Sequence, residues 1–179
     1  MTSLNQKIFY ALNSFAGRSD FIDSVIIFVA SWLPFILVAF VLVYFIFIKR
    51  NPKRLFILSI LVFVSAFITE TMKWAIFRHP RPFAALPDVV SLINISSLDS
   101  FPSQHATIFT ALATSIFIYD RRLGIWFVVF AVIISVARVV AGVHYPLDVL
   151  TGCVIGFIVP FFAYLLFLKF INFIRHYTS

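Results

Sequence analysis

Long, almost uninterrupted apolar runs restrict this chain to very few folds. Hydrophobic residues make up 62% of its 179 residues, and charged residues only 12%. A water-soluble domain of this size would expose far too much apolar surface. Runs of about 20 apolar residues are long enough to cross a bilayer as helices. The sequence therefore predicts an all-α fold, a polytopic transmembrane helix bundle that forms a single domain over residues 1–179.

Polar turns divide the apolar runs into about five expected spans. The spans cover about residues 21–48, 55–77, 103–119, 123–140 and 146–170. They form an expected bundle over residues 21–170, from which a polar loop at 78–102 emerges. Pro34 lies inside the first span, where a kink is expected.

The first residues are too few to span a membrane. Within residues 3–16, four apolar side chains fall near one face of a helix: Leu4, Ile8, Leu12 and Phe15. This pattern predicts an N-terminal interfacial helix that lies along the bilayer surface.

Basic residues gather in the turns on one side of the expected bundle. They are Lys49, Arg50, Lys53, Arg54, Arg121, Arg122, Lys169 and Arg175. Because basic loops tend to stay in the cytoplasm, we expect a multi-pass protein of the cell (plasma or inner) membrane, with loop 78–102 on the extracytoplasmic side. Loop cations and anionic lipid also explain the net charge of +7, so no nucleic-acid partner is expected.

Ionisable residues interrupt the apolar pattern in three segments, at residues 73–82, 101–105 and 138–148. Helices about 22 to 31 Å long separate these segments from the basic turns. A hydrocarbon core is about 30 Å thick, so all three should meet near the outer interface. Ionisable groups near a membrane core are costly and usually functional.

The cations in these segments suit a phosphate group. Lys73, Arg81 and Arg138 can surround a dianion, because arginine offers paired donors and lysine a point charge. Ser103 can add a hydroxyl. If a helix begins at the next residue, the backbone amides of Gln104 and His105 also favour an anion.

The histidines and the aspartate suit phosphoryl transfer. Pro146 favours a helix start, which puts His144 just before the helix and Asp148 in its first turn. The carboxylate can then accept from one ring nitrogen and leave the other free to attack phosphorus. His105 would protonate the leaving oxygen and later help to activate water. Because this needs neutral His144 and protonated His105 together, we expect a bell-shaped pH profile.

The three segments resemble the signature motifs of the type 2 phosphatidic acid phosphatase family of integral membrane lipid phosphatases. That pattern is a lysine before Arg-Pro, then Pro-Ser-Gly-His, then Ser-Arg followed by a spaced His and Asp. Here seven residues instead of six separate Lys73 from Arg81, Gln104 replaces the glycine, and Ala137 replaces the serine.

The resemblance implies a role for each matching residue. The catalytic residues would be the nucleophile His144, its partner Asp148 and the acid His105. The phosphate would be held by Lys73, Arg81, Ser103, Gln104 and Arg138. The family works without a metal ion, so neither a metal nor another cofactor is expected.

Finer features are most similar to the bacterial undecaprenyl-diphosphate phosphatase branch of this family. They are the polar Gln104, the segments 81–83 and 144–149, the small size and the interfacial helix. Such enzymes release phosphate from a C55 isoprenyl diphosphate carrier at the outer membrane face, in cell wall biogenesis. The partner implied is therefore a membrane lipid phosphate within the bilayer.

Other interpretations stay open at this point. The substrate could be phosphatidylglycerophosphate, phosphatidate or a lipid A phosphate, the reaction could be lipid phosphotransfer, and a small transporter is a distant alternative. Lys73 could pair with Glu70, and Ser103 could simply cap a helix. Gly152 and Gly156 could pack within the fold or between copies, and the oligomeric state is not fixed by the sequence.

Overall fold

The computed structural model describes the backbone of residues 3–75 and 79–178 and the side chains as far as residue 170. The expected end of the second span at residue 77 and the start of the loop at residue 78 lie outside the described residues.

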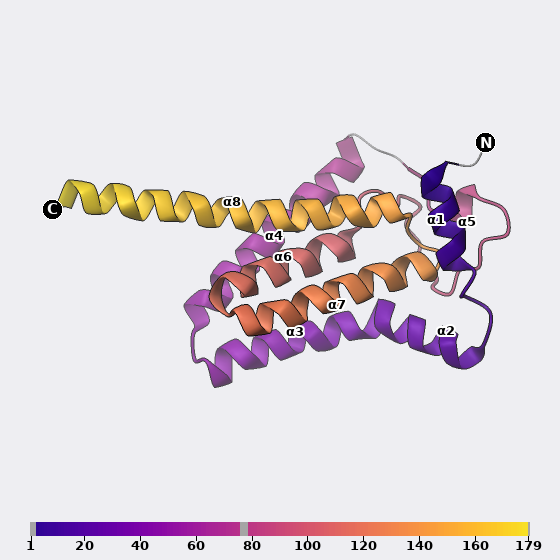
Figure 1. Cartoon of the computed structure of the whole chain (residues 1–179), viewed down its shortest axis with the longest axis horizontal. Helices are drawn as coiled ribbons and strands as arrows, with labels where there is room; N and C mark the ends of the chain where they lie inside the picture. The colour runs from indigo at the N-terminus through magenta and orange to yellow at the C-terminus, as the bar shows by residue number, and fades with distance from the viewer. Residues whose placement is uncertain (1–2, 76–78, 179) are drawn as a thin grey trace.

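Antiparallel helices form the bundle (Figure 1). A short helix, α1 (Leu4–Asn13), precedes a continuous helical run of four pieces, and five further helices follow. The four pieces are α2 (Asp20–Ile27), the π-helical turn η1 (Phe28–Trp32), α3 (Leu33–Val43) and the π-helical turn η2 (Tyr44–Ile48). The later helices are α4 (Pro52–Ala75), α5 (Pro82–Ala85), α6 (Gln104–Tyr119), α7 (Arg121–Val140) and α8 (Pro146–Thr178).

Four of the described helical segments are long and apolar enough to cross a membrane. They are Asp20–Ile48, Pro52–Ala75, Arg121–Val140 and Pro146–Phe170. The expected third span corresponds to α6, which has 16 residues and lies at the centre, packed against α4, α7 and α8. The prediction of an all-α, multi-pass membrane bundle is confirmed.

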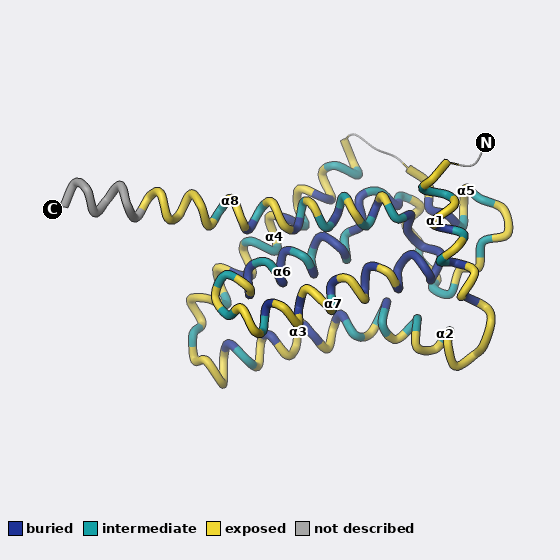
Figure 2. Tube along the Cα trace, viewed as in Figure 1, coloured by how far each residue is buried: buried dark blue, intermediate teal, exposed yellow. Residues whose placement is uncertain are grey.

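The core of the bundle joins α3, α4, α6 and α7. It contains large side chains such as Phe45, Leu58, Ile116, Phe127 and Ile134. Large apolar side chains also cover the outer surface: the exposed fraction is 70% for Phe35 and 68% for Phe63. Figure 2 shows this exposed surface along α3, α4 and α8, with the buried residues concentrated in α6 and α7. A helix that is apolar on all sides is expected where lipid replaces water.

The basic turns gather at one end, as the sequence predicts. The Tyr44 hydroxyl donates to Asp120 Oδ2 at 3.1 Å, and the Arg54 guanidinium lies 5.1 Å from the centroid of the Tyr119 ring. These contacts bring the turn before α4 beside the turn before α7. Helices α1 and α5 and the turn between α7 and α8 lie at the opposite end (Figure 1).

Two glycines let α8 lie directly against α6. A Cβ atom on Gly152 would lie 2.5 Å from the Ser103 carbonyl oxygen, and one on Gly156 would lie 2.4 Å from that of Thr107. Both glycines therefore serve packing within the fold, which is one of the two alternatives that the sequence left open. This close approach brings the start of α6 beside the start of α8.

Candidate active site

The turn that carries His144 begins where α7 ends, and this helix end depends on a glycine. Gly142 has a φ of +78°, its N–H donates to the Val139 carbonyl at 3.0 Å, and the Val143 N–H donates to the Arg138 carbonyl at 3.3 Å. These two bonds form a Schellman motif, which requires a left-handed residue at the position of Gly142. The chain therefore leaves α7 sharply and presents His144 two residues later, 2% exposed.

The start of α8 orients the carboxylate. Pro146 occupies the first helical position, and Asp148 Oδ2 accepts a hydrogen bond from the Tyr145 N–H at 2.8 Å. This contact is one half of a capping box. It directs the buried carboxylate toward His144, whose Nδ1 lies 3.7 Å from the same oxygen. The two side chains thus stand side by side, at a separation that a small ring movement would shorten to a hydrogen bond.

The outer loop carries Arg81 to the histidine. At the base of the loop, the Arg81 N–H donates to the Leu98 carbonyl, and the Ser100 N–H to the His79 carbonyl. The guanidinium is buried; its Nε donates to the Ser97 carbonyl at 2.6 Å and its Nη1 to the Val143 carbonyl at 2.7 Å.

The same Nη1 lies 3.3 Å from His144 Nε2. If Nε2 accepts from Arg81, the ring proton lies on Nδ1, which faces Asp148. That is the tautomer that the sequence predicted.

A second buried arginine comes from α7. Arg138 is 5% exposed, and its Nη1 donates to the Ala30 carbonyl in η1 at 3.4 Å. Its Nε is buried without a hydrogen-bond partner in the structure. This donor is free for an anion.

The start of α6 supplies the third segment. Ser103 holds the cap position, but its hydroxyl makes no capping bond and is buried without a partner. The Ser103 N–H donates to the Asp148 carbonyl at 3.0 Å, which fixes α6 against α8. Because α6 begins at Gln104, the first amides of the helix have no acceptor within it, as an anion site requires. The interpretation of Ser103 as a cap alone is wrong.

Gln104 and His105 follow in the first turn of α6. The Gln104 side chain donates from Nε2 to the Ala66 carbonyl of α4 at 3.4 Å, so it helps to join α6 to α4. His105 is half-buried and interacts electrostatically with Arg138, His144, Lys73 and Arg81. The imidazole therefore lies among the predicted cations and the predicted nucleophile.

Lys73 lies at the end of α4. Its Nζ is 3.4 Å from Glu70 Oε2, so the pairing that the sequence left open is present. The Lys73 side chain is only 12% exposed, and it also interacts electrostatically with Arg81. The structure thus places Lys73 beside the other cations, with one acidic partner already in contact.

Burial sets the protonation of His144, which lies outside the membrane-spanning helices. Burial lowers the pKa of the imidazole from 6.5 to about 4; Asp148 opposes this shift, and Arg138 and Arg81 add to it. The ring is therefore neutral at pH 7. In this neutral ring the lone pair lies on Nε2, beside the Arg81 guanidinium, and Nε2 is therefore equipped to attack phosphorus.

Sequence reasoning missed the backbone carbonyls that fix the two arginines. They belong to Ser97, Val143 and Ala30. It also missed a hydroxyl pair beneath Ser103, in which Thr69 Oγ1 donates to Thr107 Oγ1 at 2.9 Å. Carbonyl groups carry no signal in a sequence, and lone threonines in apolar runs carry little.

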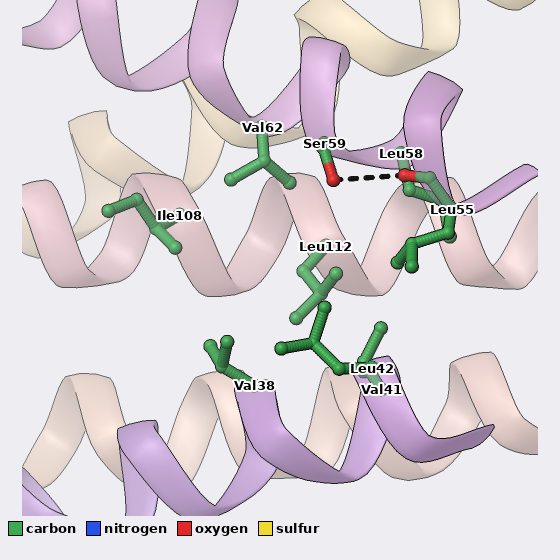
Figure 3. A pocket seen from close by; sticks show the side chains of 9 residues that line it. All are labelled: Val38, Val41, Leu42, Leu55, Leu58, Ser59, Val62, Ile108 and Leu112. Atoms are coloured by element: carbon green, nitrogen blue, oxygen red, sulfur yellow. Dashed lines mark hydrogen bonds between the residues drawn. The ribbon is translucent and has the colours of Figure 1, made fainter. Parts of the chain in front are cut away.

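An apolar cavity lies deeper in the bundle, between α3, α4 and α6 (Figure 3). Its volume is about 110 Å³, and its lining consists of Val38, Val41, Leu42, Leu55, Leu58, Ser59, Val62, Ile108 and Leu112. The one hydroxyl in this lining, Ser59 Oγ, donates to the Leu55 carbonyl of its own helix. The cavity is therefore suited to hydrocarbon and not to phosphate.

Known proteins are similar to this chain in sequence. Residues 53–172 match the model of the PAP2 superfamily. The chain is 28% identical over 163 residues to the "Bacitracin transport permease protein BcrC" of Bacillus licheniformis, which covers 91% of this chain and 80% of that one. It is 25% identical over 176 residues to the "Undecaprenyl-diphosphatase BcrC" of Bacillus subtilis strain 168, covering 98% and 89%.

A solved structure is also similar. The crystal structure of Aquifex aeolicus LpxE matches with a TM-score of 0.72 and 29% identity, over 90% of this chain and 94% of that one. The eight predicted site residues all lie within the matched residues 53–172, and α1 lies before them.

Proposed function

This chain belongs to the PAP2 superfamily, and we propose that it hydrolyses undecaprenyl diphosphate to undecaprenyl phosphate and phosphate. The reaction passes through a phosphohistidine at His144, on the extracytoplasmic side of the cell membrane. The substrate follows from the similarity to the B. subtilis relative, which is named for that activity. The chemistry follows from the site.

One observation carries the phosphate assignment. Ser103 Oγ at the start of α6 and Arg138 Nε in α7 are both buried without a partner. The Ser103 backbone contacts Asp148, and Arg138 interacts electrostatically with Arg81 and His144. An unpaired buried donor costs about 1–3 kcal/mol, and more where the group is charged. A phosphoryl group whose oxygens accept from these donors would remove that cost, which supports a site built for an anion.

The first chemical step transfers the terminal phosphoryl group to the protein. His144 Nε2 forms a bond to the terminal phosphorus while the bond from phosphorus to the bridging oxygen breaks. Undecaprenyl phosphate leaves with that oxygen, which takes a proton from His105. Arg81, Arg138 and Lys73 stabilise the charge on the non-bridging oxygens.

The second step releases phosphate. His105, now neutral, accepts a proton from water as the water oxygen attacks phosphorus and the bond from phosphorus to Nε2 breaks. Asp148 stabilises the positive charge on the His144 ring while phosphorus is attached and keeps Nδ1 protonated when the ring is neutral. Phosphate leaves, and His105 is protonated for the next cycle.

The apolar cavity supports a lipid substrate. Ile108 and Leu112 line it, and they lie three and seven residues after His105, on the same face of α6. Hydrocarbon can therefore extend from the phosphate site toward the middle of the bundle. We assign this cavity to part of the isoprenoid tail.

The transporter alternative fits the geometry less well. Among the described residues, the buried charged side chains are Arg81, Arg138 and Asp148, and these three lie together at one end of the bundle. A translocation path through the membrane would instead require polar groups at several depths.

Phosphate release by the purified protein in detergent tests the proposal. We would offer undecaprenyl diphosphate, phosphatidylglycerophosphate, phosphatidate and a lipid A phosphate, with EDTA present. His144→Ala should lower kcat by about 10³-fold or more. Asp120→Asn is the control: it changes a charged residue at the opposite end, keeps a good cap residue for α7, and should retain activity.

The outcomes separate the alternatives. Preference for undecaprenyl diphosphate supports the proposed substrate, and preference for another lipid replaces it. If folded protein releases no phosphate until a lipid alcohol is added, the reaction is phosphotransfer. Equal release by His144→Ala would refute the phosphohistidine mechanism.

A further inference from the structure

One side of the interfacial helix α1 contacts the turn that carries His144. We call residues 141–147, between the end of α7 and the first turn of α8, the catalytic turn. Asn5, Phe9 and Asn13 follow one another at intervals of four residues, so they share one face of α1. Each of them reaches a different part of the catalytic turn or of its flanking helices.

Asn13 joins the end of α7 to the outer loop. Its side chain is 3% exposed, and Nδ2 donates to the Val140 carbonyl at 2.9 Å and to the Val90 carbonyl at 2.8 Å. The Val90 N–H in turn donates to Asn13 Oδ1 at 3.1 Å. A single amide thus fixes the point at which the chain leaves α7, beside Gly142.

Phe9 packs under the middle of the catalytic turn. Its side chain is fully buried, and its ring centroid lies 5.5 Å from that of Tyr145. Tyr145 follows His144 directly, and its N–H holds Asp148. Displacement of the Tyr145 backbone would therefore move the nucleophile and its partner carboxylate together.

Asn5 holds the far end of the turn. Its Oδ1 accepts from the Leu147 N–H at 3.1 Å. This N–H belongs to the first turn of α8, where backbone donors have no acceptor within the helix. Contacts from α1 thus lie just before the catalytic turn, within it and at its last residue.

The role of α1 in the bundle is otherwise small. The main core joins α3, α4, α6 and α7, and it contains no residue of α1. On a neighbouring face, α1 exposes apolar side chains, including Leu4 at 73% and Ile8 at 43%, and Phe15 just after the helix is 50% exposed. This surface suits the membrane interface. Phe9 belongs to a separate, smaller cluster with Val139 and Tyr145, outside the main core.

We propose that α1 is a positioning element for catalysis, which holds the catalytic turn so that His144 stays buried between Arg81 and Asp148. The inference rests on the proposed function, because it assigns His144 as the nucleophile. It adds Asn5, Phe9 and Asn13 as positioning residues that lie outside the segment matched to the family.

The test compares the two sides of α1 in the full chain. Asn13→Asp keeps the size and one acceptor but removes both donated bonds, and Phe9→Ala removes the contact with Tyr145. Phe15→Ala, on the lipid-facing side, is the control. Phosphate release from undecaprenyl diphosphate gives kcat, KM and their pH dependence, and thermal unfolding gives Tm.

We expect Asn13→Asp and Phe9→Ala to lower kcat by about 10-fold or more, with KM changed less than about 3-fold. Phe15→Ala should leave kcat unchanged. A loosened turn admits water to His144, so the acid limb of kcat/KM should move upward, toward the ordinary histidine value of about 6.5. The charged and titratable groups that face His144 are Arg81, Arg138, Asp148 and His105, and each variant keeps them. Asn13→Asp adds a carboxylate that would itself raise the pKa of His144, so the shift of the acid limb is read from Phe9→Ala.

A conservative pair of variants keeps the test decisive if Asn13→Asp does not fold. Asn5→Ala removes the acceptor for the Leu147 N–H, and Asn5→Asp retains it. We expect Asn5→Ala to lower kcat and Asn5→Asp to restore it.

Two results would overturn the inference. They are an unchanged kcat and acid limb in both inner-side variants, or an equal loss in Phe15→Ala. Failure of the proposed function is distinguishable, because His144→Ala would then keep the activity of the wild-type protein.

Discussion

The acid limb of the pH profile tests whether the protein keeps its nucleophile neutral by burial. His144 is 2% exposed beside two guanidiniums, and burial lowers its pKa to about 4. A base with a lowered pKa stays unprotonated to lower pH. The neutral, nucleophilic form should therefore persist well below the pH at which an ordinary histidine becomes charged, and the bell-shaped profile should have an unusually low acid limb.

The expected effect at pH 5 is large. With a pKa of about 4, about 90% of His144 is neutral at that pH, whereas an ordinary pKa of about 6.5 would leave about 3%. Protonation of His144 should therefore lower kcat/KM only slightly at pH 5, whereas protonation of an ordinary histidine would lower it about 30-fold. The value of kcat/KM reports groups of the free enzyme, so it is the quantity to follow from pH 3.5 to 9.

Two measurements isolate His144 from other groups. The ionisation of the lipid diphosphate is measured by phosphorus NMR in the same micelles, and the kinetic profile is corrected for it. Nitrogen NMR of labelled histidine rings gives the titration directly, and the signal that disappears in His144→Ala identifies the residue. A midpoint near 6.5 for that signal would refute the argument from burial.

Three substitutions test other parts of the site. Asp148→Asn should keep the bond from the Tyr145 N–H but no longer stabilise the charged ring of His144, so kcat should fall by about 10²–10⁴-fold in the phosphate-release assay. Gly152→Leu places a side chain where even a Cβ would lie 2.5 Å from the Ser103 carbonyl; it should separate α6 from α8 and lower both kcat, by about 10-fold or more, and Tm. Val62→Trp should fill the apolar cavity and lower kcat/KM for undecaprenyl diphosphate by about 10-fold, but leave isopentenyl diphosphate, whose tail is too short to fill the cavity, unaffected in a competition assay. Equal losses for the two lipids would contradict the tail assignment.

The sequence predicted the helix bundle and the proximity of the three polar segments for a simple physical reason. Apolar runs, basic turns and helical rise are regular enough to place residues by counting. Counting put residues 73–82, 101–105 and 138–148 at one interface, and the structure brings Lys73, Arg81, His105, Arg138 and His144 within electrostatic range there. The same counting could not show that Lys73 contacts Glu70, or that Ser103 leaves its cap bond unmade.

The apolar face of α1 predicted a helix at this position, but its inner face was not predicted. Asn5, Phe9 and Asn13 repeat at a helical interval, which is visible in the sequence. Asparagines are also expected on the face of an interfacial helix that contacts water, so the pattern alone does not indicate contacts with protein. Only the contacts with Leu147, Tyr145 and Val140 distinguish a face that packs on protein from one that faces water.

The proline of the first span shows how a local irregularity supports a distant site. The sequence predicted a kink at Pro34, and the structure has the π-helical turn η1 just before it. Proline has no N–H, so Pro34 cannot donate to the carbonyl of Ala30, four residues earlier. That carbonyl instead accepts from Arg138 Nη1 at 3.4 Å, across the contact between η1 and α7. A carbonyl that lacks its usual helical donor is a rare acceptor inside a membrane, and here it helps to hold a buried cation whose Nε stays free for phosphate.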